Sequence, residues 1–135
     1  MPLDKLEHYL VLTDDIDGTR DFYVEALGMQ VGPRPPLGFP GYWVYVGDTP
    51  CIHIAEWATY TEHSGGLGIP VSHKADGTGP VDHIAFNAHD YEDVVARVER
   101  SGVQAQRNDP PGGFLKQLFL EDPNGVKIEI NVRIA

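Results

Sequence analysis

Four residues of this 135-residue chain stand out because their types suit a metal site and their spacing repeats. His8 and His53 form one pair, and His83 and Glu129 form the other. The interval from His8 to His83 and the interval from His53 to Glu129 agree to within a single position. Imidazole and carboxylate groups hold ions such as Zn, Fe, Ni and Mn in proteins. The matched pairs therefore indicate one metal site built from two similar segments.

The stretches around these residues alternate as β-strands do. In 126–132, VKIEINV, one face is wholly apolar and Glu129 lies on the other. In 51–57, CIHIAEW, His53 shares its face with Cys51 rather than with the isoleucines. Buried imidazoles and carboxylates must be paired, hydrogen-bonded or metal-bound. The simpler alternatives are a core histidine with one hydrogen bond, and an ion pair between Glu129 and a histidine without metal.

The elements that must position these residues also repeat. Each half reads βαβββ, and the glycines that follow the two helices, Gly28 and Gly102, are separated by almost the same interval as the histidines. The predicted elements of the first half are a strand at 5–12, a helix at 16–27, and strands at 29–31, 41–48 and 51–57. Those of the second half are a strand at 81–86, a helix at 91–101, and strands at 103–107, 114–122 and 126–132.

We therefore predict an α+β fold in which two tandem βαβββ modules form a curled mixed sheet around a metal cavity. The first module is expected at 4–58 and the second at 80–134. Between them, 59–79 are polar and glycine-rich, so they are expected to be an irregular linker that either only connects the modules or also covers a site. All of 1–135 would form a single domain.

Composition excludes several partners. The formal net charge is −10, so a phosphate backbone would be repelled and no nucleic acid is expected. No apolar run approaches the roughly 20 residues of a membrane span, and the N-terminal MPLDKLEHYL lacks the pattern of a signal peptide. The single cysteine, Cys51, fits a reducing compartment. These features predict a cytoplasmic protein.

Three stretches resemble the vicinal oxygen chelate superfamily, which includes glyoxalase I, methylmalonyl-CoA epimerase, extradiol dioxygenases, fosfomycin-resistance enzymes and bleomycin-binding proteins. They are EHYLVLTDDIDGTRDFYVEALGM at 7–29, VDHIAF at 81–86 and LFLEDPNGVKIEI at 118–130. The resemblance implies that His8, His83 and Glu129 bind a divalent metal, with Fe(II) favoured and Ni, Mn, Zn or Co as alternatives. It also implies a homodimer, whose sites lie within one chain or across the interface.

His53 distinguishes the chemistries that the resemblance allows. In the extradiol dioxygenases a histidine in this region acts as acid and base outside the metal shell, so His53 is predicted to be catalytic in ring cleavage of a catechol-like substrate. It would instead be a fourth metal ligand in an enzyme like glyoxalase I, or a core residue. The sequence departs from the dioxygenase pattern at Phe119, which replaces a tyrosine that those enzymes often carry and so lacks its hydroxyl. Gln117 lies on the same face and could substitute for that hydroxyl.

Side chains expected to line the substrate pocket come from both halves, and they are Phe39, Tyr42, Trp43, Tyr45, Gln117 and Phe119. The first alternative function is a lyase or epimerase that transfers a proton with a divalent metal, as glyoxalase I does. The second is a drug-binding protein without catalysis, of the bleomycin-resistance kind. Retention of all four ligand-type residues argues against this last alternative.

Overall fold

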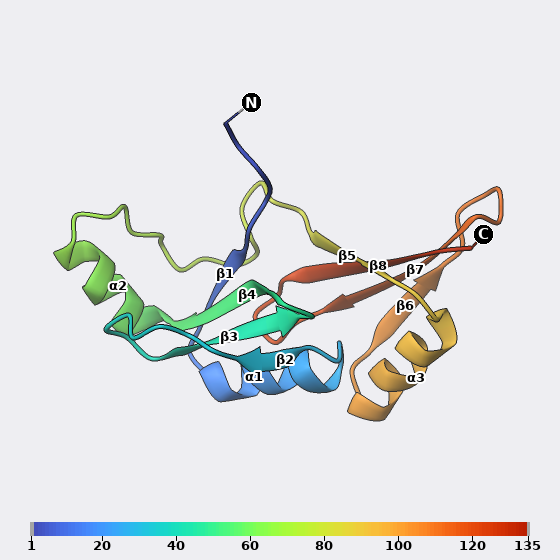
Figure 1. The fold of residues 1–135 in the computed structure, drawn as a ribbon, viewed down its shortest axis with the longest axis horizontal. Coiled ribbons are helices and arrows are strands. Elements are labelled where there is room, and N and C mark those ends of the chain that lie inside the picture. Colours follow the sequence, from blue (N-terminus) through green and yellow to red (C-terminus); the bar gives the residue numbers. More distant parts are fainter. Residues whose placement is uncertain (1, 135) are drawn as a thin grey trace. The chain divides into compact units, whose positions relative to one another are not determined.

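A computed structural model describes residues 2–134 and divides the chain into two compact units (Figure 1). Unit 1 comprises the chain up to Arg20 together with Met29–Lys74. Unit 2 comprises Asp21–Gly28 and the chain from Ala75 onward. Each unit contains one four-stranded sheet. No helix in the described residues is both long and apolar enough to cross a membrane.

The sheet of unit 1 has the strand order β1-β4-β3-β2, in which β1 and β4 are parallel and the other pairs antiparallel. Its buried face is formed by alternating apolar residues, including Val11, Val44, Ile52 and Ile54, each at most 6% exposed. The strands are β1 (Tyr9–Thr13), β2 (Gln30–Gly32), β3 (Gly41–Val46) and β4 (Thr49–Glu56).

The sheet of unit 2 repeats this arrangement in the order β5-β8-β7-β6, with β5 and β8 parallel. Its apolar face holds Ile84, Leu118, Ile128 and Ile130, each at most 8% exposed. The strands are β5 (Ile84–Ala88), β6 (Ala105–Asn108), β7 (Leu115–Glu121) and β8 (Lys127–Arg133). Helix α3 (Tyr91–Ser101) contributes buried valines to the same unit and ends at Gly102, whose φ is +79°.

The two units share one register. In unit 1 Leu10 of β1 lies opposite His53 of β4, and in unit 2 Ala85 of β5 lies opposite Glu129 of β8. This confirms the predicted α+β fold of two βαβββ modules with mixed four-stranded sheets. Helix α1 (Ile16–Glu25) ends two residues before the predicted Leu27, and the turn that follows it closes at Gly28, the predicted cap, with a φ of +74°.

The structure differs from the expected fold in two places. His8 and His83, expected within strands at 5–12 and 81–86, lie just before β1 and β5, which begin at Tyr9 and Ile84. Residues 59–66, expected to be irregular, belong to helix α2 (Trp57–Gly66), which follows β4 without a break. The helix ends in a pair of glycines, and the backbone N–H groups of Leu67 and Ile69 bond to the Ser64 carbonyl. A short helix with a weak apolar stripe carries no periodic signal that separates it from a polar loop. The module boundaries at 4–58 and 80–134 stay a prediction.

A buried hydrogen bond ties α1 to the turn between β7 and β8 within unit 2. The hydroxyl of Tyr23, which is fully buried, donates to Oδ2 of Asp122 at 2.8 Å. The other carboxylate oxygen of Asp122 accepts from the backbone N–H groups of Asn124 and Val126. Burial, and then the neighbouring Asp122, raise the pKa of Tyr23, so the phenol remains a donor. The DPNG turn thus depends on a tyrosine 99 residues away.

We expect Tyr23→Phe to lower the free energy of unfolding by about 1.5–3 kcal/mol, because it removes one donor from a buried carboxylate. Urea denaturation followed by circular dichroism measures the change. Tyr42→Phe is the matched control, since its hydroxyl bonds to exposed Asp17, and it should cost less than about 0.5 kcal/mol. Equal losses of unfolding free energy in the two variants would show that the buried hydrogen bond of Tyr23 stabilises the fold no more than the exposed bond of Tyr42.

Candidate functional site

In unit 1 two histidines and a tryptophan form a continuous stack, here called half-site 1 (His8, Trp43 and His53). The rings of His8 and His53 are 3.7 Å apart between centroids and tilted by 14°. The rings of His53 and Trp43 are 4.2 Å apart and tilted by 10°. The register explains the stack: Trp43 of β3 lies opposite His53, and His8 lies two residues before Leu10, which pairs with His53 on its other side.

In unit 2 a histidine and a carboxylate occupy the equivalent positions, here called half-site 2 (His83 and Glu129). Nε2 of His83 lies 3.6 Å from Oε1 of Glu129. The side chain of Glu129 is 16% exposed and that of His83 is 36% exposed. His83 lies two residues before Ala85, which pairs with Glu129, just as His8 lies two residues before Leu10. The predicted pairs are therefore each brought together inside one unit.

An acidic residue precedes each of the two equivalent histidines and holds its ring. Nδ1 of His8 lies 2.9 Å from Oε1 of Glu7, and Nδ1 of His83 lies 2.7 Å from Oδ2 of Asp82. A carboxylate at Nδ1 fixes the ring orientation and leaves Nε2 for a ligand. The hydrogen bond from His83, and then the one from Lys127, lower the pKa of Asp82. The dipeptides EH and DH, at equivalent places in the two halves of the sequence, are the signal from which these contacts could have been predicted.

A chain of side-chain amides leads to Glu129 across three strands. Nδ2 of Asn131 donates to Oε2 of Glu129 at 2.7 Å, and Nε2 of Gln117 donates to Oδ1 of Asn131 at 3.0 Å. Nδ2 of Asn108 donates in turn to Oε1 of Gln117 at 2.7 Å. Because Oε2 is held by Asn131, Oε1 is the oxygen that faces His83. Gln117 was predicted to line the pocket; Asn108 and Asn131 were not assigned a role.

His53 is the titratable group of half-site 1 whose protonation is most affected by its surroundings. Burial, and then repulsion by His8, lower the pKa of His53 below the usual 6.5. The backbone of Pro50 acts in the opposite direction and raises the pKa of His53 in part. His53 is therefore neutral at pH 7, which is the form that binds a metal or takes up a proton.

The aromatic residues predicted to line the pocket do not all lie on one face. Trp43 stacks on His53, and Phe119 lies opposite Glu129 in the register, so both belong to the face of the half-sites. Tyr42 lies opposite Ile54 and its hydroxyl bonds to Asp17 of α1, so it points to the helix-covered face. The Tyr45 hydroxyl donates to the Pro33 carbonyl.

Phe39 lies in the loop between β2 and β3 and packs toward α2. Its ring contacts Tyr60 edge-to-face at 5.2 Å and His63 at 5.0 Å between centroids. Phe39 therefore borders helix α2 of unit 1 rather than contacting the stacked rings of half-site 1.

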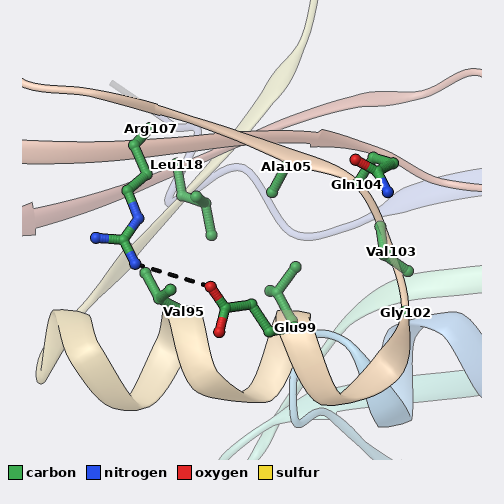
Figure 2. Close-up of a pocket in the computed structure, with 9 residues that line it drawn as sticks. Val95, Glu99, Gly102, Val103, Gln104, Ala105, Arg107 and Leu118 are labelled. Atoms are coloured by element: carbon green, nitrogen blue, oxygen red, sulfur yellow. Dashed lines mark ion pairs between the residues drawn. The ribbon is translucent and has the colours of Figure 1, made fainter.

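A groove of about 290 Å³ in unit 2 lies between α3 and β6, and it contains none of the predicted site residues (Figure 2). Val95 of α3 faces Leu118 of the sheet across it, and Val98 and Ala105 also line it. Glu99 and Arg107 form an ion pair at its rim, with 3.9 Å between their atoms. Over residues 2–134, no group of three or more His, Cys, Asp or Glu side chains is gathered for a metal, so the candidates occur as pairs.

Comparisons with known proteins agree on one superfamily. The family described as Glyoxalase/Bleomycin resistance protein/Dioxygenase superfamily matches residues 5–130. "Glyoxylase I 4" of Arabidopsis thaliana is 32% identical over 132 residues, which cover 95% of this chain and 70% of that protein. Divalent metals are common in this superfamily, and most of its members are enzymes.

Solved structures share the fold at lower identity. The lactoylglutathione lyase of Agrobacterium tumefaciens has a TM-score of 0.70 at 19% identity and covers 97% of this chain and 95% of its own. An antibiotic binding protein from a Streptomyces species has a TM-score of 0.69 at 19% identity and covers 99% of both chains. The fold thus occurs both in an enzyme and in a binding protein.

We expect His53 to titrate below 6.5 in metal-free protein, as followed by NMR of its ring protons. The folded state then binds fewer protons than the unfolded state, so this contribution to stability is present above about pH 6.5 and is lost as the pH falls through the folded pKa. His8→Gln should move the pKa of His53 part of the way back, since burial remains. A pKa of 6.5 or above for His53 would contradict this account.

Proposed function

Because the chain belongs to the Glyoxalase/Bleomycin resistance protein/Dioxygenase superfamily, we propose that it is a divalent-metal enzyme of the lyase or isomerase type. Its substrate would present two vicinal oxygens to the metal. One observation carries this proposal: two donor pairs, His8 with His53 and His83 with Glu129, occupy the same register in the two units. The likeness to a glyoxylase I of A. thaliana favours this chemistry over ring cleavage.

The donor residues fit a divalent ion. Ligand bonds of about 2.0–2.2 Å at roughly right-angled or tetrahedral positions separate two donor atoms by about 3.0–3.5 Å. The 3.6 Å between Nε2 of His83 and Oε1 of Glu129 is close to this value. Both atoms are the free ends of side chains whose other ends are held, by Asp82 and by Asn131. Such outer partners are typical of metal ligands.

We place His53 with the ligands. It occupies in unit 1 the register position that Glu129 occupies in unit 2, and it is in contact with His8. The proposed donor set is therefore His8, His53, His83 and Glu129. The sequence favoured His53 as an acid and base outside the metal shell, and this role remains the alternative, because a neutral imidazole also suits proton transfer.

A bound ion of this kind would act as a Lewis acid on the two oxygens of the substrate and make the adjacent C–H bond more acidic. The residues of the chain would then move the proton. His53 or Glu129 takes it from one carbon and returns it to the neighbouring carbon, so no oxidant is required. Trp43 and Phe119, which lie beside His53 and Glu129 in the register, would exclude water from the reacting carbons.

Ring cleavage by an Fe(II) dioxygenase is the second candidate. The observation in its favour is the neutral His53 beside His8, because such a histidine can accept the proton of a catechol. Phe119 lacks the hydroxyl expected on this strand in extradiol dioxygenases, which weakens this candidate. A non-catalytic drug-binding role is less well supported, because it requires neither the four donor residues nor the side chains that orient them.

The reaction type is tested by loading metal-free protein separately with Ni, Co, Zn and, anaerobically, Fe(II). We expect turnover of α-hydroxycarbonyl or hemithioacetal substrates without O₂, and no O₂ uptake with a panel of catechols. O₂ uptake by the Fe(II) form, together with inactivity of the Ni and Co forms, would replace this proposal with the dioxygenase.

Substitution of the donors separates the roles of His53. His83→Ala and Glu129→Gln should each weaken Zn binding by more than the roughly 10- to 100-fold that loss of an outer partner costs. If His53 is a ligand, His53→Ala should do the same and His53→Glu should restore binding, measured by competition with a coloured chelator. His73→Ala, on an exposed residue in 59–79, is the control. Unchanged affinity with a lower kcat in His53→Ala would assign it to proton transfer alone.

We also propose a homodimer, and mixing of subunits tests where each site lies. His8→Ala and His83→Ala should each be inactive alone. If each site takes His8 from one chain and His83 from the other, refolding an equal mixture should regain about a quarter of the wild-type sites, by random pairing. No recovery from a confirmed mixed dimer would place each site within one chain, and a monomer at all concentrations would exclude the dimer.

A further inference from the structure

Arg34 is a half-buried cation that the mechanism does not use. It lies in the loop between β2 and β3, where its Nη2 donates to the Phe39 carbonyl at 2.8 Å and its guanidinium lies 5.1 Å from the Phe39 ring centroid. Phe39 is held in turn by Tyr60 of α2. The guanidinium is thus fixed by a carbonyl and an aromatic face before any ligand arrives.

The guanidinium lies near the start of β3, the strand that carries Trp43 of half-site 1. A Cβ placed on Gly41 would lie 2.1 Å from the Ile54 carbonyl oxygen and 3.2 Å from Nη2 of Arg34, so the guanidinium lies close to this glycine at the start of β3. Gly41 precedes Trp43 by two residues on β3 and shares its face, and Trp43 stacks on His53. Two residues of strand span about 7 Å.

The position in unit 2 that is equivalent to Gly41 holds a different residue. Gly41 lies opposite Ala55, and the matching pair is Gln117 opposite Asn131. In unit 2 these two amides and Asn108 form the chain that ends on Glu129. In unit 1 the small residues Gly41 and Ala55 cannot form such a chain, and the guanidinium of Arg34 occupies the place instead.

Arg34 has no carboxylate partner. Its one hydrogen bond among residues 2–134 goes to the Phe39 carbonyl, and it forms no ion pair with an Asp or Glu of this range. Among the described residues, Arg20, Lys74, Arg107 and Lys127 do form such ion pairs. Burial lowers the pKa of Arg34, which shows that the charge is partly removed from water. An arginine fixed in this way has most of its N–H donors left for an anion.

We propose that Arg34 binds a carboxylate of the substrate, about 7 Å from half-site 1 along β3. This inference rests on the proposed function, because it assigns the substrate class of the same site: a vicinal-oxygen compound with a carboxylate arm. The planar guanidinium matches a carboxylate in two parallel hydrogen bonds. Arg20 and Lys74 are engaged with Asp17 and Asp14, so a single negative charge fits better than a phosphate.

Adipic monohydroxamic acid and its methyl ester test the inference. Both carry the same two vicinal oxygens for a metal, and only the acid has a charged end. With Zn-loaded wild-type protein, calorimetry should show the acid binding about 10- to 100-fold more tightly than the ester. Arg34→Gln should remove this difference and leave the ester and Zn affinities unchanged, and Arg34→Lys should retain part of it. Arg100→Gln, on an exposed arginine of α3, should behave as wild type.

The outcomes separate this inference from the proposed function. An acid that binds no more tightly than its ester, or an Arg34→Gln variant that keeps the full preference, overturns the role of Arg34. The metal site is overturned if both compounds bind without Zn, or if binding survives the double substitution His83→Ala with Glu129→Gln. In that case the acid and the ester are still compared, and tighter binding of the acid that is lost in Arg34→Gln supports the role of Arg34. An adverse result for one proposal therefore does not count against the other.

Discussion

The parallel pairing of the first and last strands of each unit is the constraint on which the site depends. It places residues that are distant in sequence side by side: His8 beside His53 in unit 1, and His83 beside Glu129 in unit 2. The apolar face of each sheet fixes this register, because Ile52 and Ile128 are at most 1% exposed. A slip by one residue would bury the polar donors and expose the isoleucines. The core therefore determines the geometry of the donors.

Donors placed in this way still need their orientation, and each unit provides it locally. The residue before each equivalent histidine is acidic and binds Nδ1, which leaves Nε2 as the free nitrogen. Glu129 is held by Asn131, so one of its oxygens is fixed. These partners are close in sequence or lie on the neighbouring strand, and for this reason they follow directly from the strand register. Removal of one such partner is expected to weaken a metal site without unfolding the sheet.

Much of the fold was predictable because it repeats. The near-equal spacing of the two donor pairs and of the glycines that end α1 and α3 predicted two βαβββ modules, and the structure confirms them. Helix α2 was missed because its polar composition gives no clear period. Tyr42 was predicted to line the pocket, yet it points to α1, because neighbouring residues of a strand alternate between faces. The bond from Tyr23 to Asp122 spans 99 residues, and no local pattern encodes it.

The two units differ in the residues that occupy equivalent register positions. The same register position holds a neutral His53 in unit 1 and the carboxylate Glu129 in unit 2. Two identical units would carry either two carboxylates or none at this position, whereas these two units carry one carboxylate and one imidazole there. A second difference follows the same logic, since Gly41 and Ala55 stand where unit 2 has Gln117 and Asn131. Unit 2 uses that position to orient a donor. In unit 1 Arg34 lies beside Gly41, and a guanidinium there suits the carboxylate binding that we propose for it.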